Sequence, residues 1–470
     1  MRGIISWGAH VPYRRLDCST IPEFFGSGGG RTSRSVASFD EDTTSMAVEA
    51  ARPAMRRGIT APDQLWFVTT DPAYMDRTNA TAVHAALRLP ESTIAMDMIG
   101  SSRTAAGVLR NACQGRGTTA VVGSDIRVGL PTSPDEAAGG DAAACIIIGD
   151  DSAAAPVLAR LVGSGVATRE FVDRWRIPGE PQTQTWDERF SENVYRPLVA
   201  TAFSAACADA GVQSEEIDRA TVSCWSARVA KRAELGAPDG ATVPPLEGVG
   251  WTGAADPMLL LQVMLDHAQP DELLALVVMA DGVDVQIYRT TNAIVANRPL
   301  RSVAEQAAIT GDVPYAKFLS WRGLITTDPP RRPMPARTSA VAAARVTDWK
   351  FGLVGSRDSG TGDVYLPPSR RSIGESEAAM VEIPMADAEG TIVTFTVDKL
   401  AWSPSPPIVF AVVDFDGGGR MPIELTDVDP DDVSIGDRIE LTFRCLSETD
   451  GIANYFWKGR PVRREQPHGE

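Results

Sequence analysis

The chain has 470 residues, enough for two or three domains, and its 43% hydrophobic and 23% charged residues are an ordinary globular balance. Its formal net charge of −16 argues against nucleic acid and anionic membranes as partners. No run approaches the roughly 20 apolar residues of a membrane span. The six scattered cysteines form no CxxC pair, which predicts a cytoplasmic protein without disulfides or a cysteine zinc site.

Strand and helix patterns alternate over the first ~300 residues, which predicts an α/β fold. A helical pattern over 46–59 ends at Gly58, and a β-rich run over 63–70 follows it. Another helical pattern, 79–90, stops at Pro90. The segments 117–127 and 142–150 are short and apolar throughout, as expected of strands buried on both faces.

The same order of elements returns about 150 residues later, which indicates a duplicated α/β unit. The helix, glycine, acidic turn and strand of 194–224 match the earlier segment 46–70. The stretch 248–265 matches 97–112, since both run from a strand end through small residues into a helix. Small residues at corresponding places, Ala105 to Gly107 and Gly253 to Ala255, predict two central helices in close contact.

This duplication resembles the thiolase superfamily, and particular stretches sharpen the resemblance. "RGIISWGAHVPYRRL", "DEDTTSMAVEAAR", "TNATAVHAALRLP", "AAGGDAAACIIIGDD" and "VGWTGAADPMLLLQVMLDHA" are similar to the 3-hydroxy-3-methylglutaryl-CoA synthase and ketoacyl-ACP synthase III branch. The resemblance implies a layered α/β/α/β/α fold with halves at 1–160 and 161–325. It also implies an acyl-CoA ligand and a homodimer that pairs through the strand "AAACIIIGD".

Each family site position that can be carried over is substituted. The family's nucleophilic cysteine, at the start of the first central helix, falls on Ser102 in "GSSRTAAGVL". Its histidine falls on Cys224 or the neighbouring Ser223, and its glutamate near Thr69. Its late glycine-rich turn is "ADG" over 280–282.

Two interpretations of Ser102 stay open. As a nucleophile it would need an adjacent base, and the helical patterns around His84 and His267 are more typical of packing. As a structural residue it would cap the helix with its hydroxyl. Cys113 lies at the wrong end of the helix to be a thiolate.

Arginines are the candidate ligands of CoA. Arg103 lies in the first turn of the helix, where it either pairs with Asp97 or Asp125 or contacts a CoA phosphate or an acyl carboxylate. Arg127 and Arg228 are further candidates, with Lys231 the weakest because surface cations are mostly solvated.

The last third predicts a linker over 326–346, rich in proline, arginine and alanine, and a ribbon over 347–388. The ribbon sequence resembles the zinc ribbon of acyl-CoA-associated OB-fold proteins. Its cysteine pairs are missing, and no Cys or His occurs from Tyr288 to Leu400. Since a structural zinc needs four such ligands, we expect no zinc and no other cofactor.

Five strand patterns and a "DGGG" hairpin turn over 389–465 predict an OB-fold barrel. Its many aspartates argue against binding single-stranded nucleic acid. The resemblance implies a helper domain that docks a thiolase partner beside an acyl-CoA tunnel.

Three functions are compatible with these features. Loss of the cysteine, histidine and zinc ligands together favours a subunit or scaffold of a thiolase or acyltransferase complex. The first alternative is an active acyl-CoA transferase or C–C bond enzyme without cysteine, with Tyr74, Asp71, Asp125 and Cys224 as candidate acid–base groups. The second is a stand-alone acyl-CoA or lipid-binding protein.

Overall fold

The computed structural model divides into two compact units. It describes residues 1–55, 59, 61–238, 240–328, 331–373 and 378–463. The first unit comprises Met1–Ala37, Met46–Thr81 and Leu89–Leu324, and the second comprises Ser38–Ser45, Ala82–Arg88 and Ile325–Glu470. No helix of the described part is both long and apolar enough to cross a bilayer.

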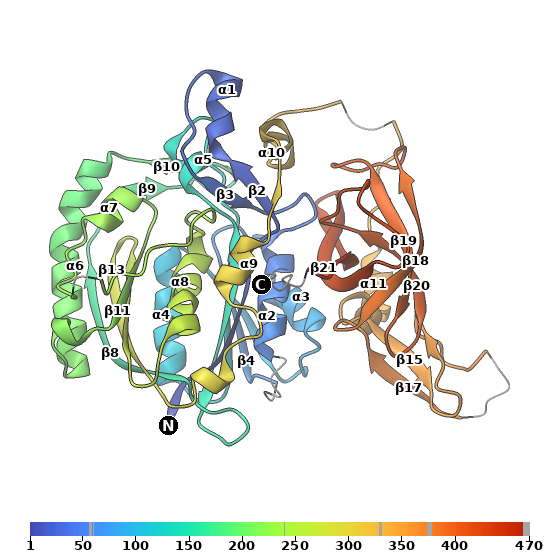
Figure 1. Cartoon of the computed structure of the whole chain (residues 1–470), viewed down its shortest axis with the longest axis horizontal. Coiled ribbons are helices and arrows are strands. Elements are labelled where there is room, and N and C mark those ends of the chain that lie inside the picture. Colours follow the sequence, from blue (N-terminus) through green and yellow to red (C-terminus); the bar gives the residue numbers. More distant parts are fainter. Residues whose placement is uncertain (56–58, 60, 239, 329–330, 374–377, 464–470) are drawn as a thin grey trace, which may run out of the picture. The chain divides into compact units, whose positions relative to one another are not determined.

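One mixed sheet runs through the first unit (Figure 1), in the strand order β11-β12-β13-β8-β1-β7-β6-β4-β5. The bounds of its strands are β1 Arg2–His10, β4 Gln64–Thr69, β5 Ile94–Ile99, β6 Thr119–Asp125, β7 Ala142–Asp150, β8 Ala159–Thr168, β11 Arg219–Cys224, β12 Leu273–Met279 and β13 Gly282–Thr290. Every residue of β6 and β12 is buried, which matches the apolar runs of the sequence.

Strand pairing confirms the predicted duplication. In the first half β1 pairs antiparallel with β7, β7 antiparallel with β6, and β6 parallel with β4. In the second half β8 pairs antiparallel with β13, β13 antiparallel with β12, and β12 parallel with β11. The two halves join where Ile4 of β1 pairs with Ala159 of β8.

Two central helices lie among these strands, as the small residues predicted (Figure 1). They are α4, Ser102–Gln114, and α8, Asp256–His267, the latter preceded by the 3-10 turn η3, Gly253–Ala255. Ala105, Ala106, Ala254 and Ala255 have no exposed surface. With only a methyl group on each, these positions let the two helices approach closely.

Outer helices cover the halves. Helix α6, Glu188–Ala210, packs on β8 and β13, and α2, Thr43–Met55, covers β1. The predicted end of the latter helix, Gly58, lies outside the described residues. Helix α3, Ala80–Ala86, ends before Pro90, and the chain then turns at Arg88, whose φ is 54°.

The prediction that the strand "AAACIIIGD" continues the sheet into a second copy of the chain is wrong. The segment "AAACIIIGD" is β7, and both of its edges are already hydrogen-bonded, to β1 and to β6. The outermost strands of this sheet are β11, whose Ala220 is bridged to Thr242, and β5, whose outer edge has no partner strand among the described residues. A sheet can be continued only from such an edge.

A closed barrel in the order β18-β19-β20-β22-β21 forms the main part of the second unit and confirms the predicted OB fold. Its strands are β18 Glu389–Asp398, β19 Ile408–Phe415, β20 Arg420–Leu425, β21 Arg438–Thr449 and β22 Ile452–Pro461. In its core Phe443 stacks on Tyr455 and meets Trp457 edge-on. The "DGGG" segment is the turn between β19 and β20, where Gly417, Gly418 and Gly419 all have positive φ.

The predicted ribbon region contains a small antiparallel sheet. In it β15, Val354–Asp358, pairs with β16, Val364–Tyr365, and with β17, Met380–Pro384. The predicted linker contains a short helix, α11, Ala340–Arg345.

Buried ion pairs tie the segment Ser38–Ser45 to the barrel within the second unit. The Lys458 ammonium lies 3.0 Å from Asp40 and also pairs with Glu424. Arg444 pairs with Glu41 and, at 2.8 Å, with Asp427. Removing one partner of such a pair would leave a buried charge uncompensated.

Two glycine substitutions test the packing of α6 on the sheet. A Cβ at Gly165 of β8 would lie 2.0 Å from the Ala202 carbonyl oxygen of α6, so we expect Gly165→Ala to destabilise the unit by roughly 1–3 kcal/mol. The matched control is Gly107→Ala in α4, where a Cβ meets no atom within 4 Å. It should stabilise by about 0.5–1 kcal/mol through helix propensity. Chemical denaturation measures the free energy of unfolding of both variants, and equal stability of the two would contradict this packing of α6 on β8.

Candidate functional site

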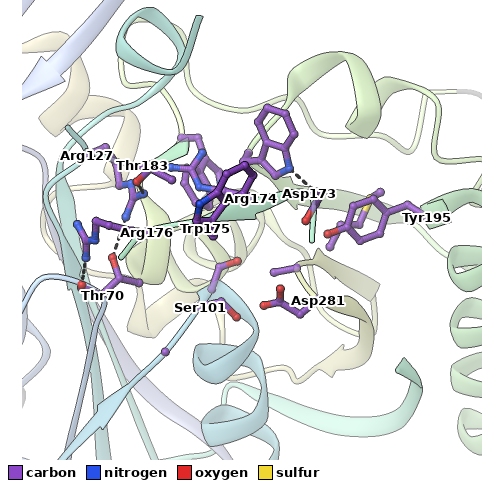
Figure 2. Close-up of a pocket in the computed structure, with 16 residues that line it drawn as sticks. Thr70, Ser101, Arg127, Asp173, Arg174, Trp175, Arg176, Thr183, Tyr195 and Asp281 are labelled. Atoms are coloured by element: carbon purple, nitrogen blue, oxygen red, sulfur yellow. Dashed lines mark hydrogen bonds between the residues drawn. The ribbon is translucent and has the colours of Figure 1, made fainter. Parts of the chain in front are cut away.

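A cavity of about 270 Å³ opens in the first unit where the parallel strands of both halves end (Figure 2). Thr70 follows β4, Gly100 to Ser102 follow β5, and Arg127 follows β6. From the second half come Trp225, after β11, and Ala280 and Asp281, after β12. Carboxyl ends of strands are where open α/β sheets bind ligands.

The start of α4 forms the floor of this cavity. Ser101 is the N-cap residue, with an extended backbone (φ −92°, ψ 179°), and its side chain makes no capping hydrogen bond. Ser102 is the first helical residue and is 2% exposed, and its hydroxyl has no hydrogen-bond partner among the described residues. Helix N-termini carry free N–H groups and a partial positive charge, so this floor offers hydrogen-bond donors to a ligand.

A short hairpin between β8 and α6 supplies the opposite wall. Its strands are β9, Arg174–Trp175, and β10, Gln184–Thr185. Asp173, Arg174, Trp175, Arg176 and Thr183 line the cavity from this hairpin. The Trp186 N–H donates to the Asp173 carbonyl over 2.7 Å, which fixes the base of the hairpin.

Arginines and tryptophans stack along this wall. The Arg174 guanidinium lies 4.4 Å from the ring centroid of Trp251 and 6.0 Å from that of Trp225. Arg127 lies 4.9 Å from the Trp251 ring. Stacking leaves guanidinium edges available for hydrogen bonds, so the wall combines rigidity with polar donors.

Each arginine of the wall is also held by polar partners. Arg127 donates to Thr70 Oγ1 over 2.7 Å and to Thr183 Oγ1 over 3.0 Å. Arg174 pairs with Asp135 at 2.5 Å, and Arg176 lies 3.9 Å from Asp71. The charge of the wall is therefore partly neutralised.

Two carboxyl groups and a tyrosine line the part of the cavity that lies away from Arg127 and Arg176. Figure 2 shows Asp173, Tyr195 and Asp281 on the right of Ser101, away from Arg127 and Arg176. Asp173 is 2% exposed, and its Oδ2 accepts a 3.1 Å hydrogen bond from Trp225 Nε1. Burial raises the pKa of Asp173.

Sequence comparison points to one enzyme group. The chain is 25% identical over 348 residues to the hydroxymethylglutaryl-CoA synthase of Pyrobaculum neutrophilum, covering 69% of this chain and 97% of that protein. It is 27% identical over 325 residues to that of Aeropyrum pernix, covering 64% and 89%. Residues 382–444 match the family described as ChsH2, C-terminal OB-fold domain.

The first unit is thiolase-like and resembles the hydroxymethylglutaryl-CoA synthases, and the second carries a ChsH2-type OB-fold domain. Solved structures agree on the fold. An HMG-CoA synthase complexed with CoA matches with a TM-score of 0.58 and 14% identity, covering 68% of this chain and 89% of that one. The 3-oxoacyl-[acyl-carrier-protein] synthase III of Aquifex aeolicus matches with a TM-score of 0.54 and 16% identity, covering 62% and 100%.

Of the two positions matched to the cysteine and histidine of thiolase-like enzymes, only Ser102 lines the cavity. The prediction that Ser102 caps the helix is wrong, because α4 begins at Ser102 and the cap position belongs to Ser101. Cys224 ends β11 beside the lining residue Trp225, and burial raises the pKa of its thiol to about 12. Ser223 donates instead to Asp256 over 2.6 Å, and burial raises the pKa of that carboxyl to about 6.

Arg103 has other partners than those predicted. It donates to the Asp281 carbonyl over 2.6 Å and to Thr168 Oγ1 over 2.5 Å, and it lies 3.7 Å from Asp284. Asp97 instead accepts from Asn79 and Ala80, and Asp125 from Thr70, Arg127 and Ala254. Thr168 and Asp281, the hydrogen-bond partners of Arg103, are 65 and 178 residues away along the chain, beyond the reach of local sequence patterns.

Arg127 lies in the cavity wall, and Arg228 does not. Arg228 is on α7, Ala227–Lys231, with 49% of its side chain exposed and Glu192 3.8 Å away. The proposed acid–base residues Tyr74, Asp71, Asp125 and Cys224 are outside the set that lines the cavity. Sequence reasoning missed the hairpin, although "FVDRWRIP" gathers an acid, two arginines and a tryptophan between a strand and a helix.

Metal binding has no visible basis in the described residues. They contain no group of three or more His, Cys, Asp or Glu side chains able to hold a metal ion. The predicted absence of zinc stays a prediction.

Proposed function

We propose that the first unit binds an acyl-CoA thioester, with its acyl group over the start of α4, and forms no covalent acyl–enzyme. The observation that carries this is Ser102, whose buried and unpartnered hydroxyl lies at the N-terminus of a central helix in the cavity floor. Solved structures similar in fold to the first unit include an HMG-CoA synthase complexed with CoA and MvaS in complex with 3-hydroxy-3-methylglutaryl coenzyme A. A hydroxyl there donates a hydrogen bond to the thioester carbonyl.

The cysteines support a non-covalent mode of binding. Burial raises the pKa of all six thiols. A thiol attacks a thioester only as its thiolate, which these environments disfavour at neutral pH. None of the six lines the cavity.

Ser102 lacks the base that a serine nucleophile requires. His10, His84 and His267 are outside the residues that line the cavity, and His468 lies outside the described part of the chain. No side chain of the described residues accepts the Ser102 proton. The hydroxyl therefore acts as a hydrogen-bond donor rather than as a nucleophile.

In the cell we propose a role as a subunit or scaffold of a thiolase or acyltransferase complex, with the OB-fold domain docking the catalytic partner. The replaced cysteine and histidine and the missing zinc ligands favour this over a self-sufficient synthase. A second candidate is a C–C bond enzyme without a thiol nucleophile, and the buried carboxyl of Asp173 in the cavity favours it.

Calorimetric titration with paired ligands tests the binding mode. Acetyl-CoA has a carbonyl for Ser102, whereas its thioether analogue, S-ethyl-CoA, has none. Ser102→Ala should weaken the binding of acetyl-CoA about 2- to 10-fold, the contribution of one hydrogen bond, and leave the affinity for S-ethyl-CoA unchanged. Arg228→Met, outside the cavity, should alter neither. Absence of binding, or equal effects on both ligands, would refute the proposed contact.

We propose further that the chain is a homodimer and that β5, at the sheet edge, is the strand that pairs. Ile94 and Ile99 of β5 are 54% and 48% exposed, which suits an edge covered by a second copy. Light scattering should give twice the mass of one chain. Ile94→Lys should yield monomers, whereas Ile373→Lys, at an exposed site of the second unit, should not. A wild-type monomer would exclude the dimer.

A further inference from the structure

Asp173 is a buried carboxylate that lines the cavity, unlike four other buried carboxylates of the first unit. Asp125, Asp256, Asp266 and Asp284 are each held by cations or several donors, and none of them lines the cavity. Asp173 is equally buried but lies in the cavity wall. Within the described residues no cation lies within ion-pair distance of it, and its polar neighbours are the Trp225 indole, which donates to Oδ2 over 3.1 Å, and the Tyr195 hydroxyl.

The cavity therefore opposes two kinds of group. On the floor, Ser102 Oγ and the free N–H groups of the first turn of α4 can stabilise negative charge that forms on an oxygen. Asp173, which Figure 2 shows above and to the right of Ser101, lines the same cavity, and its carboxylate can accept a proton. A donor set and a base on two sides of one thioester are what deprotonation beside its carbonyl needs.

We propose that Asp173 is the general base of this cavity and takes the α-proton of a bound acyl-CoA thioester. The proposal rests on the proposed binding function. The Cα–H bond breaks and its proton moves to an Asp173 oxygen. The electron pair forms the C=C bond of the enolate, whose charge rests on the former carbonyl oxygen above Ser102. Return of the proton restores the thioester, so no other reactant is consumed.

The wall holds Asp173 in place for this step. Trp225 Nε1 donates to Oδ2 over 3.1 Å, the Tyr195 hydroxyl lies beside the same carboxyl, and the Trp186 N–H donates to the backbone carbonyl of Asp173. The enolate so formed is a carbon nucleophile. An electrophilic acyl group or carbonyl compound brought by a partner subunit could then react with it, which links the step to the role of the complex.

Deuterium exchange tests the step without knowledge of any acceptor. Wild-type protein in D₂O with acetyl-CoA should introduce deuterium at the acyl carbon, measured by mass spectrometry of the recovered thioester. Asp173→Asn should slow this exchange at least about 100-fold, the contribution of a general base, and change the acetyl-CoA Kd less than about threefold. Asp271→Asn, at an exposed ion pair away from the cavity, is the matched control and should exchange like wild type.

Any other result overturns the proposal, and the contrary results can be told apart by what fails. Binding without exchange in the wild type removes the catalytic step but leaves the proposed function. Exchange that survives Asp173→Asn assigns the base elsewhere, and release of free CoA indicates hydrolysis instead. No binding at all removes the proposed function as well. If Asp173→Asn does not fold, Asp173→Glu replaces it and should retain measurable but reduced exchange, while full wild-type exchange would contradict the assignment.

Discussion

The close packing of α4 against the η3–α8 segment is the constraint on which the cavity depends. Four alanines without exposed surface let the two copies of the α/β unit meet at their central helices. Because the copies meet there, the N-terminus of α4 is enclosed by strand ends from both halves rather than by solvent. A larger side chain at these positions would separate the halves and open the floor of the cavity.

Enclosure determines what the floor can do. A helix N-terminus in water is screened, but one in a small cavity keeps its N–H groups and partial charge available to a ligand. With a thiol at this place, the same field would favour a thiolate. With Ser102 it favours a hydroxyl that donates, since no base of the described residues takes its proton.

Features carried by local pattern could be predicted from the sequence. The five barrel strands, the glycine turn between β19 and β20 and the duplicated order of strands all follow from periodicity and turn residues. The position of Ser102 at the start of α4 was also predictable. Whether it or Ser101 holds the cap was not, since helix boundaries shift by a residue or two without altering the pattern.

Contacts between distant segments could not be predicted. Arg103 finds Asp281 and Thr168, and Trp225 finds Asp173, across tens of residues or more. The hairpin that supplies one wall of the cavity has strands of two residues each, too short for any periodic signal. Its Arg174, Trp175 and Arg176 line the cavity because the tertiary structure folds the hairpin over α4. The edge strand of the sheet, β5, likewise became evident only from the pairing order.

The central claim is that this chain holds a thioester without capturing its acyl group. Intact-mass spectrometry after incubation with excess acetyl-CoA, quenched in acid at several times, measures this directly. The account predicts the unmodified mass at every time point. A stable increase by one acetyl group, located on Ser102 or on any cysteine, would contradict it.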